Sequence, residues 1–381
     1  MPWKEVSIMS ERKEFVTLAV SSDTADVREL CRRFEVSAPT AYKWLRRYQL
    51  HGEAGLADLS RRPHHSPRRT PAEVERAILE VRDRHSAWGA RKLRAWLLAH
   101  GYERMPSPST ITAILKRNGR IDASESSKHT AWQRFERQAP NELWQMDFKG
   151  HFVMSQGGRC HPLTVLDDHS RFALGVQACD NELTETVQQR LTSIFRCYGL
   201  PDRMLMDNGS PWGTQYEHGY TPLTVWLMTL GIDFGHGRPY HPQTQGKDER
   251  FHRTLKAEVL QGRNFTDLTQ CQAAFDQWRP IYNLERPHQA LSMEPPASRY
   301  HVSHKTFPET LAPPEYGPGD LVRRVQDKGD ISFKGRTFIV GRAFRGSSVA
   351  LRPTTTDGVW NVFFYSHPIT QVDLTEPDQD A

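Results

Sequence analysis

The sequence has few cysteines and no long apolar run, and each absence excludes a class of protein. Its five cysteines stand far apart, at Cys31, Cys160, Cys179, Cys197 and Cys271. Neither a zinc ribbon nor a disulfide framework is therefore expected, and we predict reduced, partly buried thiols. No stretch approaches the roughly 20 apolar residues of a membrane span. No charged-then-apolar signal segment opens the chain, so we expect a cytoplasmic protein without a membrane partner.

Basic residues are concentrated in the first part of the chain. Residues 1–140 hold 26 Lys and Arg against 17 Asp and Glu, a net charge of +9. The remaining residues hold 24 against 28, a net charge of −4. A basic segment indicates a polyanionic partner, although a solvated basic surface explains the charge equally well. The length of 381 residues allows more than one domain.

Two short helices are predicted between residues 24 and 50. The first has the spacing of an amphipathic helix at Val27, Leu30, Cys31 and Phe34. The second opens at Ser37, with a proline early where a helix tolerates it. Its polar face carries Thr40, Lys43, Arg46 and Arg47, with Tyr42 beside them. The pattern predicts a helix-turn-helix DNA-binding domain over residues 1–60, although any small helical hairpin would look similar.

Three further segments precede the middle of the chain. Residues 61–70 are rich in Pro, Arg and His and predict a linker. It either follows a DNA backbone through Arg61, Arg62, Arg68 and Arg69 or is a solvated tether. Residues 71–120 contain three apolar helical stripes, which predict a second helical, winged-helix-like DNA-binding domain. Residues 121–137 are polar and aperiodic, as expected for another linker.

From residue 138 onward, strands and helices alternate, and the last segment is all-β. Three consecutive strands are predicted within residues 142–179. They are followed by a helix over 182–198, a strand over 202–209, a helix over 222–230, a strand over 231–235 and a helix over 246–260. This order predicts an α/β core over 138–300 with a mixed five-stranded sheet. Short apolar runs between glycine-rich turns predict a small β-barrel over 315–375.

Two aspartates stand where an ionised side chain needs a partner. Asp147 lies within an apolar strand, and Asp207 directly follows another. A carboxylate at the edge of a hydrophobic core is costly unless it is paired or binds a metal ion. Taken alone, Asp207 would be a turn residue, because Asp-Asn-Gly is a strong turn sequence.

The helix over 246–260 presents a third carboxylate. Glu249, Arg253 and Lys256 share one face, while Phe251, Leu255 and Val259 share the opposite face. The helix is therefore expected to pack through its apolar side and to display Glu249 with two cations. An ordinary surface helix with a Glu–Arg pair, contributing about 0.3–0.5 kcal/mol, would give the same pattern.

The acidic residues lie in motifs that resemble a known family. WQMDF (144–148), DNGSP (207–211) and HPQTQGKDERFHRTLKAE (241–258) resemble the acidic motifs of insertion-sequence DDE transposases. These enzymes have a catalytic core of the retroviral-integrase type, within the ribonuclease H-like superfamily. The resemblance covers residues 138–300, through YNLERPHQAL (282–291), and the two N-terminal modules and the C-terminal barrel also look like that group.

The resemblance implies a catalytic trio of metal-binding carboxylates, Asp147, Asp207 and Glu249. It also implies that Gln245 and Lys256, beside Arg253, contact DNA. Forty-one residues separate Asp207 from Glu249, more than is usual in this family, and we expect the extra length within residues 211–223. Asp248 is the neighbouring rival, about 100° around the helix, but the Gly-x-x-Glu pattern favours Glu249.

A transposase of this type would bind two Mg²⁺ ions, for which Mn²⁺ can substitute, because its substrate is an anionic phosphodiester. The resemblance predicts binding to terminal inverted repeats, cleavage of the 3′ ends and joining to target DNA. The protein would be bacterial and nucleoid-associated, with double-stranded DNA and a homo-oligomer, a dimer or tetramer, as partners. Two alternatives remain: a nuclease of the same fold that does not join DNA, and a catalytically inactive DNA-binding regulator.

Overall fold

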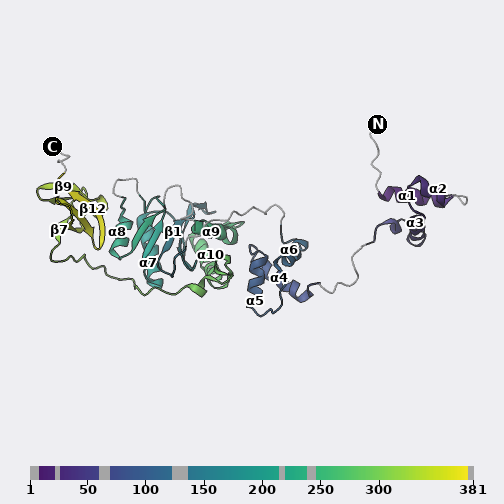
Figure 1. Cartoon of the computed structure of the whole chain (residues 1–381), viewed down its shortest axis with the longest axis horizontal. Helices are drawn as coiled ribbons and strands as arrows, with labels where there is room; N and C mark the ends of the chain where they lie inside the picture. Colours follow the sequence, from purple (N-terminus) through teal and green to yellow (C-terminus); the bar gives the residue numbers. More distant parts are fainter. Residues whose placement is uncertain are drawn as a thin grey trace, which may run out of the picture. The chain divides into compact units, whose positions relative to one another are not determined.

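A computed structural model of the chain describes residues 8–21, 26–59, 69–121, 136–213, 219–237 and 246–375 (Figure 1). The chain divides into two compact units, Met1–Arg69 and Thr70–Ala381. Within the described ranges, no helix combines the length and apolar character that crossing a bilayer requires.

The first unit is a bundle of three helices. These are α1 (Ile8–Val20), α2 (Val27–Arg33) and α3 (Ala38–His51), and the short turn η1 (Gly52–Leu56) follows them. The two predicted helices are confirmed, but α1 was not predicted. It matters because its buried Phe15 and Val16 pack against Ala41, Trp44 and Leu56 and complete the core. The unit therefore has the hydrophobic centre that a two-helix hairpin would lack.

The second unit begins with three helices around their own core. They are α4 (Ala72–Arg84), α5 (Ala90–Ala99) and α6 (Pro108–Arg117). Ser107 caps α6 by accepting a hydrogen bond from the Thr110 N–H. Residues 69–121 are all described and contain no strand, so the expected wing is not present. The prediction of a winged-helix-like module is correct for the helices and wrong for the wing.

A mixed sheet follows, with the strand order β4-β3-β1-β5-β6 and β2 paired to β3. The elements are β1 (Trp144–Phe148), β2 (Phe152–Val153), β3 (Arg159–Asp167), β4 (Ala173–Cys179), α7 (Thr184–Tyr198), β5 (Arg203–Met206), α8 (Pro222–Thr229) and β6 (Asp233–His236). The β1–β3–β4 pairings are antiparallel, whereas β1–β5 and β5–β6 are parallel. The predicted mixed five-stranded sheet is confirmed, with the two-residue β2 added.

Side-chain alternation along β1 divides the core into two layers. Trp144 and Met146 point into a cluster that includes residues of α7 and α8. Gln145 and Asp147 therefore face the other side, since the strand period is two residues. That side is covered by α9 (Gly246–Leu255), η3 (Lys256–Leu260), α10 (Leu268–Pro280) and η4 (Ile281–Glu285). The polar residues of β1 thus share a face with α9.

Short turns η5 (Gln289–Leu291) and η6 (Pro296–Arg299) lead into the last segment. Its strands are β7 (Leu321–Arg324), β8 (Asp330–Phe333), β9 (Arg336–Ile339), β10 (Ser348–Pro353), β11 (Val359–Phe364) and β12 (His367–Asp373), with the turn η7 (Arg342–Phe344) between β9 and β10. They form a four-stranded sheet, β12-β11-β10-β7, and a separate β8–β9 pair. A closed barrel is not confirmed, because the described pairings leave both sheets open, although one hydrophobic cluster joins them.

Helix α7 offers a matched test of how the core is stabilised. Leu191 is fully buried, whereas Leu183 at the start of the helix is 60% exposed. We expect Leu191→Ala to lower the free energy of unfolding by about 2–5 kcal/mol, through lost burial and a cavity. Leu183→Ala should change it by less than about 0.5 kcal/mol. Urea unfolding followed by circular dichroism measures both, and equal losses would contradict this packing.

Candidate active site

The parallel pairing of β1 with β5 sets the first two candidate carboxylates side by side. Gln145 lies opposite Leu205 in this pairing. Two residues further along each strand, Asp147 and Asp207 reach the same level on neighbouring strands, which lie about 4.8 Å apart. The structure therefore brings together two of the three predicted site residues, although 60 positions separate them in the chain.

Asp147 is in an environment that disfavours its charge. Burial raises its pKa to about 7, and the negative charge of Asp207 adds to the rise, while the Phe148 N–H partly opposes it. A negative charge nearby makes deprotonation of a carboxyl group less favourable and so raises its pKa. A cation placed between the two groups would remove this penalty.

Asp207 is held in place by its own turn and by a tryptophan. Its Oδ1 accepts hydrogen bonds from the Gly209 N–H, at 2.9 Å, and from the Trp212 indole. The Trp212 ring stacks on Phe148, with the ring centroids 5.3 Å apart. Sequence reasoning expected only an insertion here and missed Trp212. The one signal was a large aromatic side chain directly after the turn.

Helix α9 has the two faces that the sequence predicts. Phe251, Leu255 and Val259 are buried in the core. On the opposite side, the Glu249 side chain is 68% exposed and lies 4.0 Å from Arg253. Lys256 is also exposed, at the start of η3. Glu249 is therefore at the surface of the site.

The buried carboxylate of α9 is Asp248. It is 2% exposed, and its Oδ1 is buried without a hydrogen-bond partner. Burial raises its pKa well above the usual range, and the charges of Asp147 and Asp168 raise it further. The residue weighed as a rival to Glu249 is therefore the one enclosed in the core, within the electrostatic influence of Asp147.

A histidine one turn further along α9 borders the same site. His252 is 8% exposed, and its Nδ1 lies 3.8 Å from the Asp147 Oδ2. Its Nε2 lies 2.8 Å from Thr164 Oγ1, which donates to the Asp147 backbone carbonyl. Since that hydroxyl proton is engaged, Nε2 donates to Thr164 and Nδ1 carries a lone pair. Burial, followed by the charge of Lys149, lowers the His252 pKa to about 4, so the ring is neutral at pH 7.

Two of the carboxylates fit a divalent cation, but the described residues do not complete a site. Among them, no group of three His, Cys, Asp or Glu side chains is arranged to hold a metal ion. Asp147 and Asp207 supply hard oxygen ligands of the type that Mg²⁺ prefers. Residues 238–245, directly before α9, lie outside the described ranges, and so does Gln245.

The predicted DNA-contact residues of the first unit fall into two groups. Tyr42, Lys43 and Arg46 are exposed on α3, as is Arg69 beyond it. Arg47, by contrast, donates to the Ala57 carbonyl at 2.5 Å and lies over the Trp44 ring. Thr40 pairs with the Ser37 hydroxyl at 2.9 Å. Arg61, Arg62 and Arg68 lie outside the described residues.

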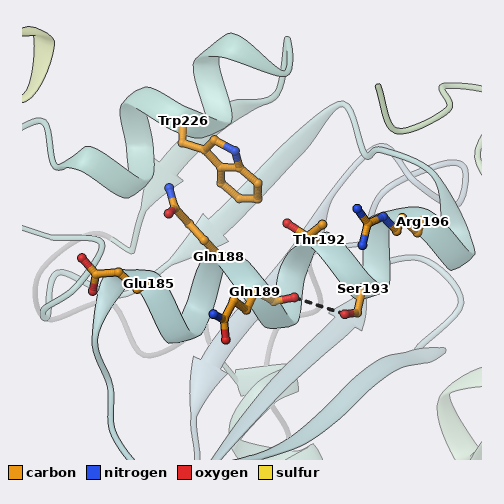
Figure 2. Close-up of a pocket in the computed structure, with 7 residues that line it drawn as sticks. All are labelled: Glu185, Gln188, Gln189, Thr192, Ser193, Arg196 and Trp226. Carbon is orange, nitrogen blue, oxygen red and sulfur yellow. Dashed lines mark hydrogen bonds between the residues drawn. The ribbon is translucent and has the colours of Figure 1, made fainter. Parts of the chain in front are cut away.

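A hollow elsewhere on the core contains none of these residues. It lies along α7, with Trp226 of α8 on its far side, and the α7 residues that line it are Glu185, Gln188, Gln189, Thr192, Ser193 and Arg196 (Figure 2). No candidate carboxylate or candidate DNA contact is among them. The candidate active site is therefore the region around Asp147 and Asp207, away from this hollow.

Known protein families match almost the whole length of the chain. Residues 137–242 and 230–296 match two families described as integrase core domains. Residues 11–64 match a helix-turn-helix domain, and residues 40–115 match a homeodomain-like domain. Residues 320–380 match the C-terminal domain of IS481 family transposases.

Individual relatives agree with these matches. The insertion element IS476 uncharacterized 39.2 kDa protein of Xanthomonas euvesicatoria is 26% identical over 275 residues, 69% of this chain and 75% of that protein. The insertion element IS407 uncharacterized 31.7 kDa protein of Burkholderia multivorans is 28% identical over 174 residues, 46% of this chain and 60% of that protein. The Gag-Pro-Pol polyprotein of Sheep pulmonary adenomatosis virus is 31% identical over 132 residues, only 7% of its own length.

Solved structures give more distant likenesses. A chain of the simian T-cell lymphotropic virus intasome, solved in complex with PP2A regulatory subunit B56 gamma, superposes with a TM-score of 0.38 at 14% identity, covering 79% of this chain and 99% of that one. The HTLV-2 integrase catalytic core domain, solved in complex with magnesium, gives a TM-score of 0.33 at 16% identity, covering 43% and 99%.

The chain therefore combines matches to helix-turn-helix and homeodomain-like domains with matches to integrase core domains. Its last residues match the C-terminal domain of IS481 family transposases, and the chain is homologous to insertion-element proteins.

The raised pKa of Asp147 leads to a prediction for the pH dependence of stability in the metal-free protein. The unfolded pKa is about 3.9, whereas that of folded Asp147 is about 7. Between these values the folded state holds its proton more tightly, so wild-type stability falls as pH rises from about 4 to about 7. Asp147→Asn removes this loss and should raise the free energy of unfolding at pH 8 by up to about 4 kcal/mol, at about 1.4 kcal/mol per pKa unit.

Urea unfolding in EDTA at pH 4 and pH 8 measures the effect, which should nearly disappear at the lower pH. Asp327→Asn, whose carboxylate is 85% exposed, is the matched control and should change stability by less than about 0.5 kcal/mol at either pH. A gain from Asp147→Asn that is the same at both pH values would contradict the assigned environment.

Proposed function

We propose that this protein is the transposase of an insertion sequence. It binds the terminal inverted repeats, cleaves the 3′ ends and joins them to target DNA, with Asp147, Asp207 and Glu249 as catalytic residues. The observation that carries the proposal is the meeting of Asp147 with Asp207 beside the acidic first turn of α9, within an integrase core. A phosphodiester cannot approach such a group of carboxylates unless cations neutralise them.

Two Mg²⁺ ions, or Mn²⁺ in their place, would supply that charge and would activate the attacking water or 3′-hydroxyl and stabilise the leaving oxygen. The chain's own residues prepare for this role. Trp212 and Gly209 fix one oxygen of Asp207 and leave Oδ2 for a cation. Thr164 donates to the backbone carbonyl of Asp147, and His252 borders its carboxyl group.

Glu249 remains the proposed third carboxylate, although Asp248 is the buried carboxylate of α9. Asp248 is fully enclosed and holds its proton tightly, so it would have to be uncovered and ionised before it could bind a cation. Glu249 has a longer side chain and is already exposed, so it need not be uncovered before it binds a cation. The Gly246-x-x-Glu249 pattern supports the same choice.

The N-terminal modules would recognise the transposon ends. We assign base contacts to α3 through Thr40, Tyr42, Lys43 and Arg46, and phosphate contacts to Arg47 and to the linker arginines Arg61, Arg62, Arg68 and Arg69. Gln245, Arg253 and Lys256 would contact DNA near the chemistry. Because two ends must be held at once, a dimer or tetramer would assemble on DNA.

The proposed domains separate DNA recognition from catalysis. They are a helix-turn-helix domain over 1–60, a basic linker over 61–70, a second helical domain over 71–120, a linker over 121–137, the catalytic core over 138–300 and a C-terminal β domain over 315–375. The boundary between the two compact units, at Arg69 and Thr70, supports the first linker.

The third carboxylate can be identified with two variants. Glu249→Gln should lower cleavage and joining of labelled inverted-repeat ends by at least about 10³-fold, because it removes charge stabilisation from the transition state. End binding should stay within about twofold. Asp248→Asn should retain cleavage and joining within about tenfold, since burial already favours the uncharged form of this acid. An inactive Asp248→Asn beside an active Glu249→Gln would reverse the assignment.

The same assay, with a target plasmid and Mg²⁺ or Mn²⁺, separates the alternatives for the wild type. Joined products support the transposase. Cleavage without joining would indicate a nuclease, and binding alone would indicate a regulator.

The assignment of α3 as the helix that recognises the transposon ends leads to a separate prediction. Arg46→Ala should weaken binding to the transposon ends by about 1–3 kcal/mol and reduce discrimination against scrambled ends, because it removes a base contact. Arg32→Ala on α2, whose side chain is 74% exposed, is the control and should have little effect on discrimination. Fluorescence anisotropy at fixed salt, with transposon-end DNA and with scrambled DNA, measures the binding affinity of each variant. Equal losses for the two variants would exclude α3 as the recognition helix.

A further inference from the structure

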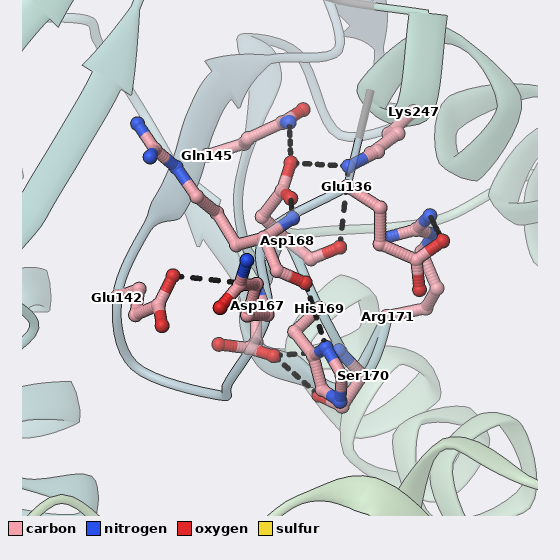
Figure 3. Close-up of polar contacts among 11 residues, drawn as sticks. Glu136, Glu142, Gln145, Asp167, Asp168, His169, Ser170, Arg171 and Lys247 are labelled. Atoms are coloured by element: carbon pink, nitrogen blue, oxygen red, sulfur yellow. Dashed lines mark hydrogen bonds and ion pairs between the residues drawn. The ribbon is translucent and has the colours of Figure 1, made fainter. Parts of the chain in front are cut away.

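A buried ion pair connects the first turn of α9 to the end of β3. The Lys247 ammonium contacts the Asp168 carboxylate, and its Nζ also lies 3.3 Å from the Asp168 backbone carbonyl (Figure 3). The Asp168 side chain is fully buried, and that of Lys247 is only 15% exposed. These two residues stand 79 positions apart. The pair is therefore a tertiary contact and not a by-product of local helix geometry.

Asp168 also holds two other segments. Its Oδ1 accepts a hydrogen bond from Gln145 Nε2 at 2.6 Å. Its Oδ2 accepts one from the Arg137 backbone N–H at 2.9 Å. One carboxylate thus links β1, the start of the core and α9, as Figure 3 shows for Gln145 and Lys247. Both oxygens are engaged, as a buried carboxylate requires.

The residues that Asp168 holds are neighbours of the proposed catalytic groups. Gln145 stands two positions before Asp147 on the same face of β1. Lys247 stands two positions before Glu249, and one before Asp248, in the first turn of α9. The contact therefore ties the strand that carries one catalytic carboxylate to the helix turn that carries another. It does so whichever of the two α9 carboxylates binds the cation.

The ion pair fixes a turn of α9 that has no buried apolar side chain of its own. The buried apolar residues of α9 begin at Phe251, one turn further along. Apolar packing is tolerant of small rotations, whereas a buried ion pair has a narrow range of favourable geometries. A shift of about 1 Å in a catalytic group can cost about 100-fold in rate. The ion pair is therefore suited to set the angle at which the α9 carboxylates face Asp147.

We propose that Asp168 is a positioning residue, which acts through Lys247 and Gln145 to hold the first turn of α9 against β1. The proposal rests on the proposed function, since it assigns a role in the same site. Asp168 does not touch the DNA or the cations. Its effect is on the distance between the strand carboxylates and those of α9.

The test uses the full chain with Lys247→Met and Asp168→Asn. Each variant leaves a buried charge without its partner. Amide hydrogen exchange in peptides covering residues 246–255 should accelerate at least tenfold. The rate constant for joining should fall at least tenfold, while the Kd for the transposon ends stays within twofold. Lys247→Arg keeps the charge and should recover joining to within about threefold of wild type.

A double variant and a surface pair complete the design. Asp168→Asn combined with Lys247→Met removes both charges, so its exchange should be slower than in either single variant. Lys305→Met breaks an exposed Lys–Asp pair, whose side chains are 54% and 59% exposed, and should leave α9 exchange and joining unchanged.

Two results would overturn the proposal: unchanged exchange in α9 for both single variants, or losses in the double variant that multiply those of the singles. A wild-type chain that never joins DNA would contradict the proposed function instead. The exchange measurement would still decide whether Asp168 positions α9.

Discussion

The candidate site depends on one constraint, which is that two carboxylates lie at the same end of two neighbouring parallel strands. The pairing of β1 with β5 sets Asp147 level with Asp207, and burial together with the Asp207 charge raises the Asp147 pKa to about 7. The sheet tolerates this unfavourable pair because apolar side chains on the other face of β1 are buried, which stabilises the fold. Trp144 and Met146 are almost fully buried there against α7 and α8. Hydrophobic burial, at about 25 cal/mol per Å², offsets the electrostatic cost.

Helix α9 must satisfy two requirements that conflict. Its apolar face, Phe251 with Leu255, packs onto the sheet, while its first turn brings acidic residues toward Asp147. Burial of Asp248 in this turn is unfavourable, because the acid is enclosed near Asp147. The positive N-terminal end of the helix dipole opposes this effect, and so does the Lys247–Asp168 ion pair. The charge of the site is therefore balanced by contacts at its border as well as by apolar packing.

The sequence predicted what depends on local periodicity and missed what depends on distant contacts. The faces of α9 follow from a 3.6-residue repeat, and the strands of the core from alternation and turn residues. The C-terminal barrel was not confirmed, because closure depends on which edge strands meet, and no local pattern encodes that. Trp212 was missed because it acts on Asp207 from an expected insertion. The burial of Asp248 was missed because a helix position gives an angle but not the neighbour that it meets.

The site differs from the well-paired buried charges of the core, and this contrast supports a functional reading. Glu258, for example, is paired with Arg286 at 2.9 Å. At the site, Asp147 and Asp207 repel each other, and the Asp248 Oδ1 is enclosed without a partner. Selection for stability alone would replace such residues with apolar or amide side chains. Their presence on three separate elements is explained if a cation and a phosphodiester complete the charge balance, because the free protein then stores a repulsion that binding relieves.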